Sequence, residues 1–194
     1  MTVQALAAER AHLAGLLDAI QRCVYFLEAS RTKHVWPLAA DGLSARRKDT
    51  GLFESLAAIN ERFAKLQDTL GAGMRHGALL AGESGETFLK ILAFYEKIGV
   101  LDSIVDWQLC RATRNLAAHE YDTDYATIAE HFNALNGLIP SLYTNASRFL
   151  VYCREELNIL PLEGDFNGEF DAIITNAKAL ASPSALKNSA NSSP

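Results

Sequence analysis

Residues 103–121 read SIVDWQLCRATRNLAAHEY and combine a helix start with an unusual concentration of polar side chains. Ser103 and Asp106 have the spacing of a capping box, in which a serine oxygen accepts a hydrogen bond from the first turn of a helix. The spacing predicts a helix that carries Trp107, Leu109 and Cys110 inward. Two arginines, an amide, an imidazole and a phenol follow before the next turn, so the same stretch fixes an element of the fold and bears the chemistry.

Outward from this stretch, apolar residues recur at spacings of three and four, which is typical of helices with one buried face. No segment keeps the alternation of a strand over any length. The sequence therefore predicts an all-α antiparallel bundle of five to six helices. The expected helical segments are 2–30, 52–70 with a continuation over 74–80, 84–98, 103–116, 125–135 and 142–157.

Two positions are expected to end helices: Gly99 as a C-terminal cap, and Pro140 as a kink or break after Gly137. The composition changes after Pro161, so we divide the chain into a bundle at 1–160 and a C-terminal extension at 161–194. That extension is expected to hold a short helix within 163–180 and then a flexible tail, because residues from 181 onward are poor in large apolar side chains.

Composition narrows the class of protein. The chain has 194 residues and a net charge of −5, which argues against a general nucleic-acid binder with a basic domain. No apolar run is long enough to cross a bilayer, and the first residues do not resemble a signal peptide. Three cysteines without paired spacing favour a reducing compartment, so we expect a cytoplasmic protein with no membrane contact.

One local departure from the acidic balance lies in residues 31–48, where five basic side chains stand against the single carboxylate of Asp41. The simpler interpretation is a solvated loop near a helix end. The alternative is a basic rim that attracts phosphate toward a nearby site.

The polar residues of the central stretch suit metal-free cleavage of RNA. His119 titrates near neutrality and can take or give the proton that moves between the ribose 2′-hydroxyl and the leaving 5′ oxygen. Arg114 stays charged and can fork onto phosphate oxygens as charge develops, while Asn115 can orient His119 or bind phosphate. Taken singly, each residue has a structural alternative, such as a histidine that favours a helix C-terminus or an arginine in a surface ion pair.

The joint pattern, Arg114-Asn115 followed by His119 and Tyr121, resembles the HEPN superfamily of ribonucleases, specifically its HepT-like toxin branch. Segments similar to 101–107 and 59–71 stand upstream in the expected order, so the likeness covers roughly residues 50–155. The resemblance implies a homodimer that meets through the motif helices and a metal-independent endoribonuclease acting on mRNA or tRNA.

Carried over residue by residue, the resemblance implies that Arg114 and His119 are catalytic and that Asn115 is their polar neighbour. It implies that Tyr121 accepts AMP from a nucleotidyltransferase antitoxin of the MntA type, as in a type VII-like toxin–antitoxin pair. ATP would serve only as the AMP donor of that partner, and the chain itself would need no cofactor and no metal. Occlusion by the partner, without modification, stays open as the inhibitory mechanism.

Three further residues are candidates for phosphate contact or support of the site: Arg111, which shares a helix face with Asn115, and Asp68 and Glu61, which stand seven apart on one predicted helix. The main alternative to a nuclease is a non-catalytic subunit that binds a nucleotide or the nucleotidyltransferase. A plain helical scaffold is the third.

Overall fold

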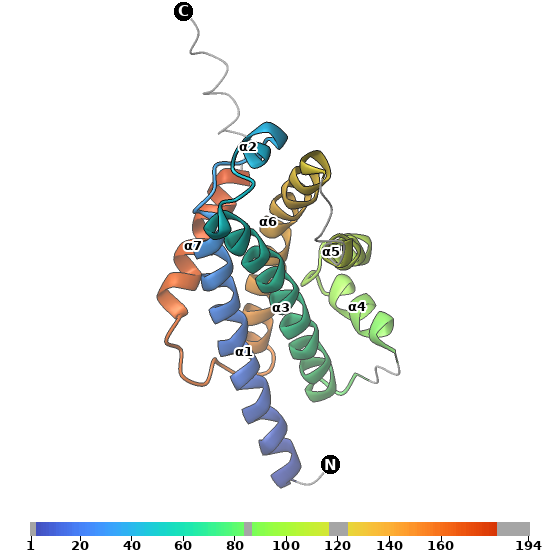
Figure 1. Cartoon of the computed structure of the whole chain (residues 1–194). Helices are drawn as coiled ribbons and strands as arrows, with labels where there is room; N and C mark the ends of the chain where they lie inside the picture. The colour runs from blue at the N-terminus through green and yellow to red at the C-terminus, as the bar shows by residue number, and fades with distance from the viewer. Residues whose placement is uncertain (1–2, 84–86, 117–123, 182–194) are drawn as a thin grey trace, which may run out of the picture.

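The computed structural model describes residues 3–83, 87–116 and 124–181, and within these ranges every regular element is an α-helix (Figure 1). The all-α class predicted from the sequence is therefore confirmed. Helices α1, α3, α4, α5 and α6 form the bundle, and a short α2 and a C-terminal α7 are added to it. The helices are α1 (Val3–Arg31), α2 (Ala40–Ala45), α3 (Thr50–Leu80), α4 (Phe88–Lys97), α5 (Ile104–Leu116), α6 (Tyr125–Glu155) and α7 (Asn167–Ala181).

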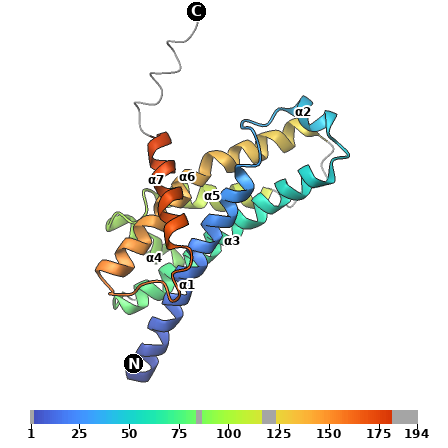
Figure 2. The ribbon, with the colours of Figure 1, turned by 90° about the vertical axis from the view of Figure 1, so that its left-hand side faces the viewer.

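The centre of the bundle is the long pair α1 and α3, which lie side by side in both views (Figures 1 and 2). Their facing stripes are fully buried, and each buried leucine contributes roughly 1.5–3 kcal/mol relative to exposure. The helices are long because these stripes continue over many turns. The buried stripe of α1 is Leu13, Leu17, Ile20, Val24 and Leu27, and that of α3 includes Leu56, Ile59, Phe63, Leu66 and Leu70.

Two glycines of α3 let aromatic rings approach its backbone. A Cβ added at Gly73 would lie 2.9 Å from a ring carbon of Phe149, and one at Gly77 would lie 2.6 Å from the Tyr95 hydroxyl oxygen. That hydroxyl donates a hydrogen bond to the carbonyl of Met74 at 3.0 Å. The absence of side chains at 73 and 77 therefore permits α4 and α6 to close over α3.

The expected break at Pro140 is wrong, because α6 runs without interruption from Tyr125 to Glu155. A proline inside a helix removes one backbone hydrogen bond and costs about 3 kcal/mol. Ile139 and Leu142 on either side of it are 1% and 0% exposed. Burial of apolar residues before and after the proline offsets the local cost, so tertiary packing overrides the propensity.

Local capping signals are more accurate. Ser103 Oγ accepts hydrogen bonds from the N–H groups of Val105 and Asp106 at 3.0 and 3.3 Å, which opens α5 as expected. Gly99 takes a φ of +75° just after α4, which is the predicted C-terminal cap. The preceding helix starts at Phe88, later than expected, because Thr87 caps it by accepting from the N–H of Lys90.

The first part of the predicted C-terminal extension packs as a layer of the bundle. Figure 2 shows α7 beside α1 and α6, and its Phe170 and Ile174 belong to the common apolar core. The loop before it is tied to α1: the N–H of Leu162 donates to the carbonyl of Ala14 at 3.2 Å, and the Asp18 carboxylate accepts from Gly164 at 2.9 Å. The tail expected beyond Ala181 lies outside the described residues.

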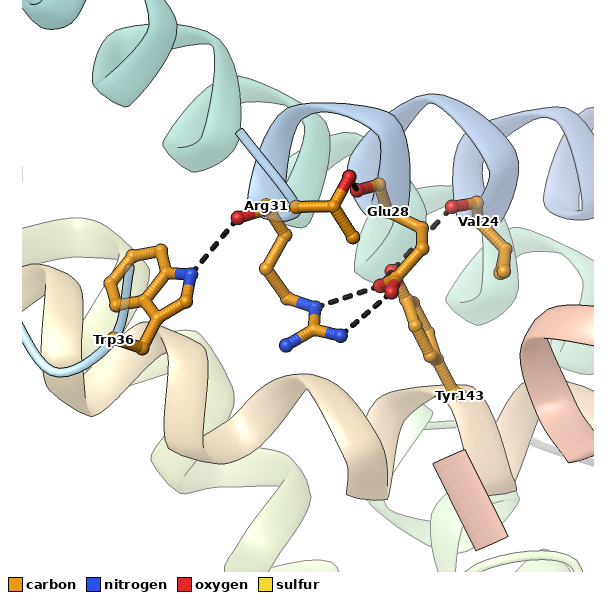
Figure 3. Close-up of polar contacts among 6 residues, drawn as sticks. Val24, Glu28, Arg31, Trp36 and Tyr143 are labelled. Carbon is orange, nitrogen blue, oxygen red and sulfur yellow. Dashed lines mark hydrogen bonds and ion pairs between the residues drawn. The ribbon is translucent and has the colours of Figure 1, made fainter. Parts of the chain in front are cut away.

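The basic segment 31–48 is partly neutralised. Arg31 forms two hydrogen bonds to the Glu28 carboxylate at 2.7 and 2.6 Å, and that carboxylate also accepts from the Tyr143 hydroxyl at 3.2 Å (Figure 3). Burial, with the adjacent Glu28 charge, raises the pKa of Tyr143, so the phenol remains a donor. The indole of Trp36 donates to the Arg31 carbonyl at 2.9 Å, which holds the start of the loop against α1 (Figure 3).

Further along the same segment, Arg46 pairs with Asp49, which lowers the pKa of that carboxyl together with a backbone hydrogen bond from Leu52. Lys33, Arg47 and Lys48 are exposed. Each interpretation of this segment therefore describes part of it. Arg31 and Arg46 are paired with carboxylates of the protein, whereas Lys33, Arg47 and Lys48 face solvent.

No described helix is both long enough and apolar enough to cross a membrane. The three thiols are free, with Cys110 and Cys153 buried and Cys23 half-buried. Burial raises the pKa of Cys110 to about 11 and that of Cys153 to about 12, so both behave as small apolar groups near neutral pH.

Candidate functional site

A cavity of about 250 Å³ lies between α3 and α5, beside the start of α4. Its walls combine three guanidinium groups, one carboxylate, one amide and two aromatic rings over a floor of small residues. The lining residues are Gln67, Asp68, Gly71, Ala72, Arg75, Phe88, Trp107, Arg111 and Arg114.

Arg114 is fixed to α3 by two hydrogen bonds. Its Nη1 donates to the backbone carbonyl of Ala64 at 2.9 Å and to the Asp68 carboxylate at 2.8 Å. The arginine side chain is 14% exposed and the aspartate 66%, so the guanidinium is held at the protein surface by a partner that is itself in water. No protein partner is recorded for Nε and Nη2 of Arg114 within the described residues, and these donors stay available to a ligand.

Gln67 holds α5 against α3 at the inner wall of the cavity. This side chain is only 2% exposed, and its Nε2 donates to the Trp107 carbonyl at 2.9 Å. Trp107 is 3% exposed and packs over Gly71, where an added Cβ would lie 3.5 Å from the indole ring. The buried hydrogen bond from the Gln67 amide and the buried Trp107 ring therefore set how closely α3 and α5 approach.

Arg75 lies over the ring of Phe88, with its guanidinium carbon 4.5 Å from the ring centroid. The Phe88 ring in turn stands edge-on to Trp107, with centroids 6.1 Å apart. A guanidinium stacked on an aromatic face is restrained without a counter-ion. The stack therefore presents a positive charge to the cavity.

Charge in this cavity is unbalanced. Asp68 is the only carboxylate among the described residues of its lining and is engaged by Arg114. Arg111 is exposed, and neither it nor Arg75 has a carboxylate partner among the described residues. The arrangement favours an anion, because a ligand's negative charge would meet two guanidinium groups that no described carboxylate neutralises.

The structure thus brings together three of the residues singled out from the sequence: Arg114, Asp68 and Arg111. Asn115 is exposed on α5 and does not line the cavity. His119 and Tyr121 lie outside the described residues, so their predicted roles are not tested by this geometry. The spatial pairing of Arg114 with Asp68 was not predicted from either residue alone.

The structure does not bring Glu61 to the cavity. The side chain stands two turns before Asp68, about 10 Å along the axis of α3 at 1.5 Å per residue. It is close enough to Cys23 of α1 to help raise the pKa of that thiol, although burial is the main cause. Glu61 therefore acts on the α1 side, and the expected support of the site rests on Asp68.

The sequence interpretation missed Arg75, Phe88 and Gln67. Arg75 stands seven residues after Asp68, which places both on the same face of α3 two turns apart, and that spacing was a usable signal. Phe88 carried no such signal, because it reaches the cavity from another helix after a turn.

The outward face of α5 also differs from expectation. Leu109 was predicted to point inward, yet it is 50% exposed, and Val105 on the same face is 74% exposed. Trp107, Cys110 and Thr113 take the buried positions. Because 107, 110 and 113 recur at a spacing of three, α5 buries that stripe and leaves Val105, Leu109 and Ala112 as an apolar strip on the surface.

Among the described residues, no group of three or more histidine, cysteine, aspartate or glutamate side chains is arranged to hold a metal ion. No protein-family model, curated protein or solved structure matches this chain.

Proposed function

We propose that this chain is a HepT-like ribonuclease toxin of the HEPN superfamily, which cuts RNA without a metal ion at a homodimer cleft. The observation that supports the proposal best is the fixation of Arg114 by Ala64 and Asp68 beside a cavity rich in guanidinium groups. Among the described residues only Nη1 of Arg114 donates to the protein, so Nε and Nη2 can donate hydrogen bonds to a phosphate.

The proposed reaction needs three groups. The ribose 2′ oxygen loses its proton to a base and attacks the adjacent phosphorus, and the bond from phosphorus to the 5′ oxygen breaks as that oxygen gains a proton. The products are a 2′,3′-cyclic phosphate and a free 5′-hydroxyl. His119 supplies the proton transfer, Arg114 binds the charge that develops on the phosphoryl oxygens, and Asn115 orients the imidazole.

The anchoring of Arg114 is what such a reaction requires. Transition-state stabilisation is strongest when the donors are held in place before the charge appears. The carboxylate of Asp68 and the carbonyl of Ala64 both restrain the guanidinium, and α3 and α5 are fixed to each other by Gln67. Arg114 therefore keeps its position when substrate is absent.

The exposed strip of α5 supports the dimer. Val105, Leu109 and Ala112 lie on the helix that leads into the motif, and all three are exposed, Val105 by 74% and Leu109 by 50%. Joining two copies through this strip would bury apolar surface in a self-complementary contact between the motif-bearing helices. We expect Leu109→Asp to yield monomers by sedimentation velocity and to lower RNA cleavage. Leu160→Asp, at an exposed leucine outside α5, is the matched control and should do neither.

Silencing follows from the same chemistry. A nucleotidyltransferase antitoxin of the MntA type transfers AMP from ATP to the Tyr121 oxygen, so that a new oxygen–phosphorus bond forms, pyrophosphate leaves and the phenol loses its proton. The added phosphate brings negative charge two residues from His119, where it competes with the RNA phosphate for arginine.

The deciding experiment is His119→Ala in the full chain, assayed on total tRNA and on an mRNA transcript in the presence of EDTA. We expect a loss of about 10²–10⁴-fold in cleavage rate, the usual contribution of a general acid or base. His34→Ala is the control, since His34 lies in the segment after α1 and hydrogen-bonds Ser55 of α3, and neither residue lines the cavity. Cleavage that survives in His119→Ala, or that EDTA abolishes in the unsubstituted chain, contradicts the proposal.

Modification is tested separately with Tyr121→Phe, radiolabelled ATP and the candidate antitoxin. Loss of label with retained toxicity assigns the modified oxygen. Silencing of Tyr121→Phe without labelling would favour occlusion by the partner.

A further inference from the structure

We infer that Arg75 and Arg111 form a second phosphate-binding position, which takes a backbone phosphate of a single-stranded RNA next to the one that is cut. This inference rests on the proposed ribonuclease function. The RNA strand bound between α3 and α5 would therefore extend beyond the scissile bond.

The first support is the free charge. Arg114 neutralises Asp68, which leaves Arg75 and Arg111 in the same cavity without a carboxylate partner among the described residues. The chain as a whole is acidic, with a net charge of −5, so two arginines in one cavity that no carboxylate of the described ranges neutralises are a local exception. Such an exception is expected where a protein must attract phosphate against an unfavourable overall charge.

The second support is preorganisation. The guanidinium of Arg75 rests on the Phe88 ring at 4.5 Å, and that ring is held by its edge contact with Trp107. An added Cβ at Gly71 would come within 3.3 Å of the Phe88 ring, so the ring sits almost on the backbone of α3. The stack occupies one face of the guanidinium and leaves the N–H edge for phosphate oxygens.

The third support is the linear order of the cations. Arg114 is bonded at Ala64 and Asp68, while Arg75 stands seven residues beyond Asp68, about 10 Å further along α3. Arg111 precedes Arg114 by nearly one turn of α5 and lines the same cavity. The three cations therefore enter one cavity from backbone positions spread along α3 and α5, which suits successive phosphates of a strand better than one isolated anion. Aromatic rings beside a positive track are also typical of sites for single-stranded nucleic acid.

The test measures RNA binding in full-length chain that carries His119→Ala, so that the RNA is bound without being cut. The probe is a 5′-fluorescein single-stranded RNA of mixed sequence, and anisotropy titrations at several KCl concentrations give the salt dependence of the association constant. We expect Arg75→Ala to weaken binding about 10-fold at moderate salt. The slope of log Kobs against log[KCl] should become shallower by about 0.7, the value for one phosphate contact with a single strand.

Arg22→Ala is the matched control. Arg22 is also an exposed arginine over a phenylalanine ring, at 5.7 Å from the centroid of Phe26, but it belongs to α1, which lies on the other side of α3 from α5 (Figure 1). This variant removes the same charge and the same kind of stack, and it should leave both the affinity and the slope unchanged. Arg75→Lys keeps the charge without the planar fork, and we expect it to keep the slope while weakening binding less than alanine does.

The outcomes separate the two proposals. If Arg75→Ala matches its parent in affinity and slope, or if Arg22→Ala has the same effect, the second phosphate position is overturned, and cleavage by the unsubstituted chain still decides the ribonuclease function. If Arg75→Ala weakens binding of a fluorescent ATP analogue but not of RNA, the assignment to a strand is overturned in favour of a mononucleotide. If RNA binding depends on Arg75 but no RNA is cut, the phosphate contact stands and the ribonuclease function is withdrawn.

Discussion

The two sides of α3 carry similar residues and use them differently. On the side of α1, Arg62 donates to the carbonyl of Phe26 and to the hydroxyl of Ser30, and His76 meets the Glu9 carboxylate at 2.7 Å. On the side of α5, Arg75 and Arg111 have no carboxylate partner in the described part of the chain. Arg62 and His76 join helices on the first side, and on the second side Arg114 joins α5 to α3 while Arg75 and Arg111 remain available.

The difference shows which arginines are structural. A buried or half-buried polar group is retained in a helix interface when its hydrogen bonds are met by the facing helix. An unneutralised guanidinium at a cavity contributes nothing of that kind to the bundle. Its presence in an acidic chain therefore calls for a ligand, and this contrast leads to four predictions.

The largest expected effect on stability is on the α1 side. Leu17→Ala removes a side chain that is 0% exposed and should lower the free energy of unfolding by about 2–5 kcal/mol. Leu109→Ala on α5 removes one that is 50% exposed and should change it by less than about 0.5 kcal/mol, measured by urea denaturation at a concentration where the chain is monomeric. Equal losses in the two variants would show that the α5 face is packed as tightly as the centre.

The next effect separates activity from stability. Arg114→Ala should reduce RNA cleavage about 10²–10³-fold, because it removes a preorganised donor to the developing charge. Arg62→Ala should leave cleavage within about two-fold and should lower the free energy of unfolding by about 1–2 kcal/mol, through the lost bonds to α1. A cleavage loss of the same size in both variants would break the contrast between structural and ligand-binding arginines.

Thiol labelling compares the two sides without a substitution. The pKa of Cys110 is raised from 9.0 to about 11 by burial, so its thiolate fraction at pH 8 is about 100-fold below that of an ordinary thiol. Cys23, half-buried between α1 and α3, should react with Ellman's reagent before Cys110 and Cys153, and peptide mapping identifies the labelled residue. Faster labelling of Cys110 than of Cys23 would indicate that α5 opens away from α3.

The smallest effect concerns His34, whose pKa is lowered by partial burial and then by the charges of Arg46 and Lys33. As the pH is lowered, the unfolded chain binds this proton near pH 6.5, whereas the folded chain binds it only at a lower pH. The free energy of unfolding therefore falls as the pH drops from about 6.5 toward the lower folded pKa. Because the side chain is largely solvated, we expect less than about 0.5 kcal/mol. His34→Gln should remove this dependence from thermal midpoints measured between pH 5 and 7.5, and an unchanged pH profile would contradict the shift.

Local signals in the sequence were reliable wherever one turn of chain decides the outcome. Ser103 as a helix cap and Gly99 as a helix end both follow from hydrogen bonds or φ values within a few residues. Pro140 and Leu109 could not be placed in this way. The first is held in a helix by burial on both sides, and the orientation of the second depends on which stripe of α5 meets α3.

The candidate site likewise has one part that local sequence predicts and another that only tertiary packing decides. The Arg114, Asn115, His119 and Tyr121 pattern could be recognised from spacing alone, and it suggested the chemistry. The partners of Arg114 could not, because Ala64 and Asp68 stand 50 and 46 residues earlier in the chain. Arg75 and Phe88 entered the site for the same reason, since only the packing of α3, α4 and α5 brings them together.

By itself, then, the sequence determined the helical class, the caps and the concentration of guanidinium, amide and imidazole groups in and after α5, because these depend on periodicity and on neighbours within one or two turns. The tertiary structure alone decided which arginines are bonded to the protein and which face a cavity. That choice is made by contacts between helices distant in the chain, and it depends on side-chain packing that no local pattern encodes.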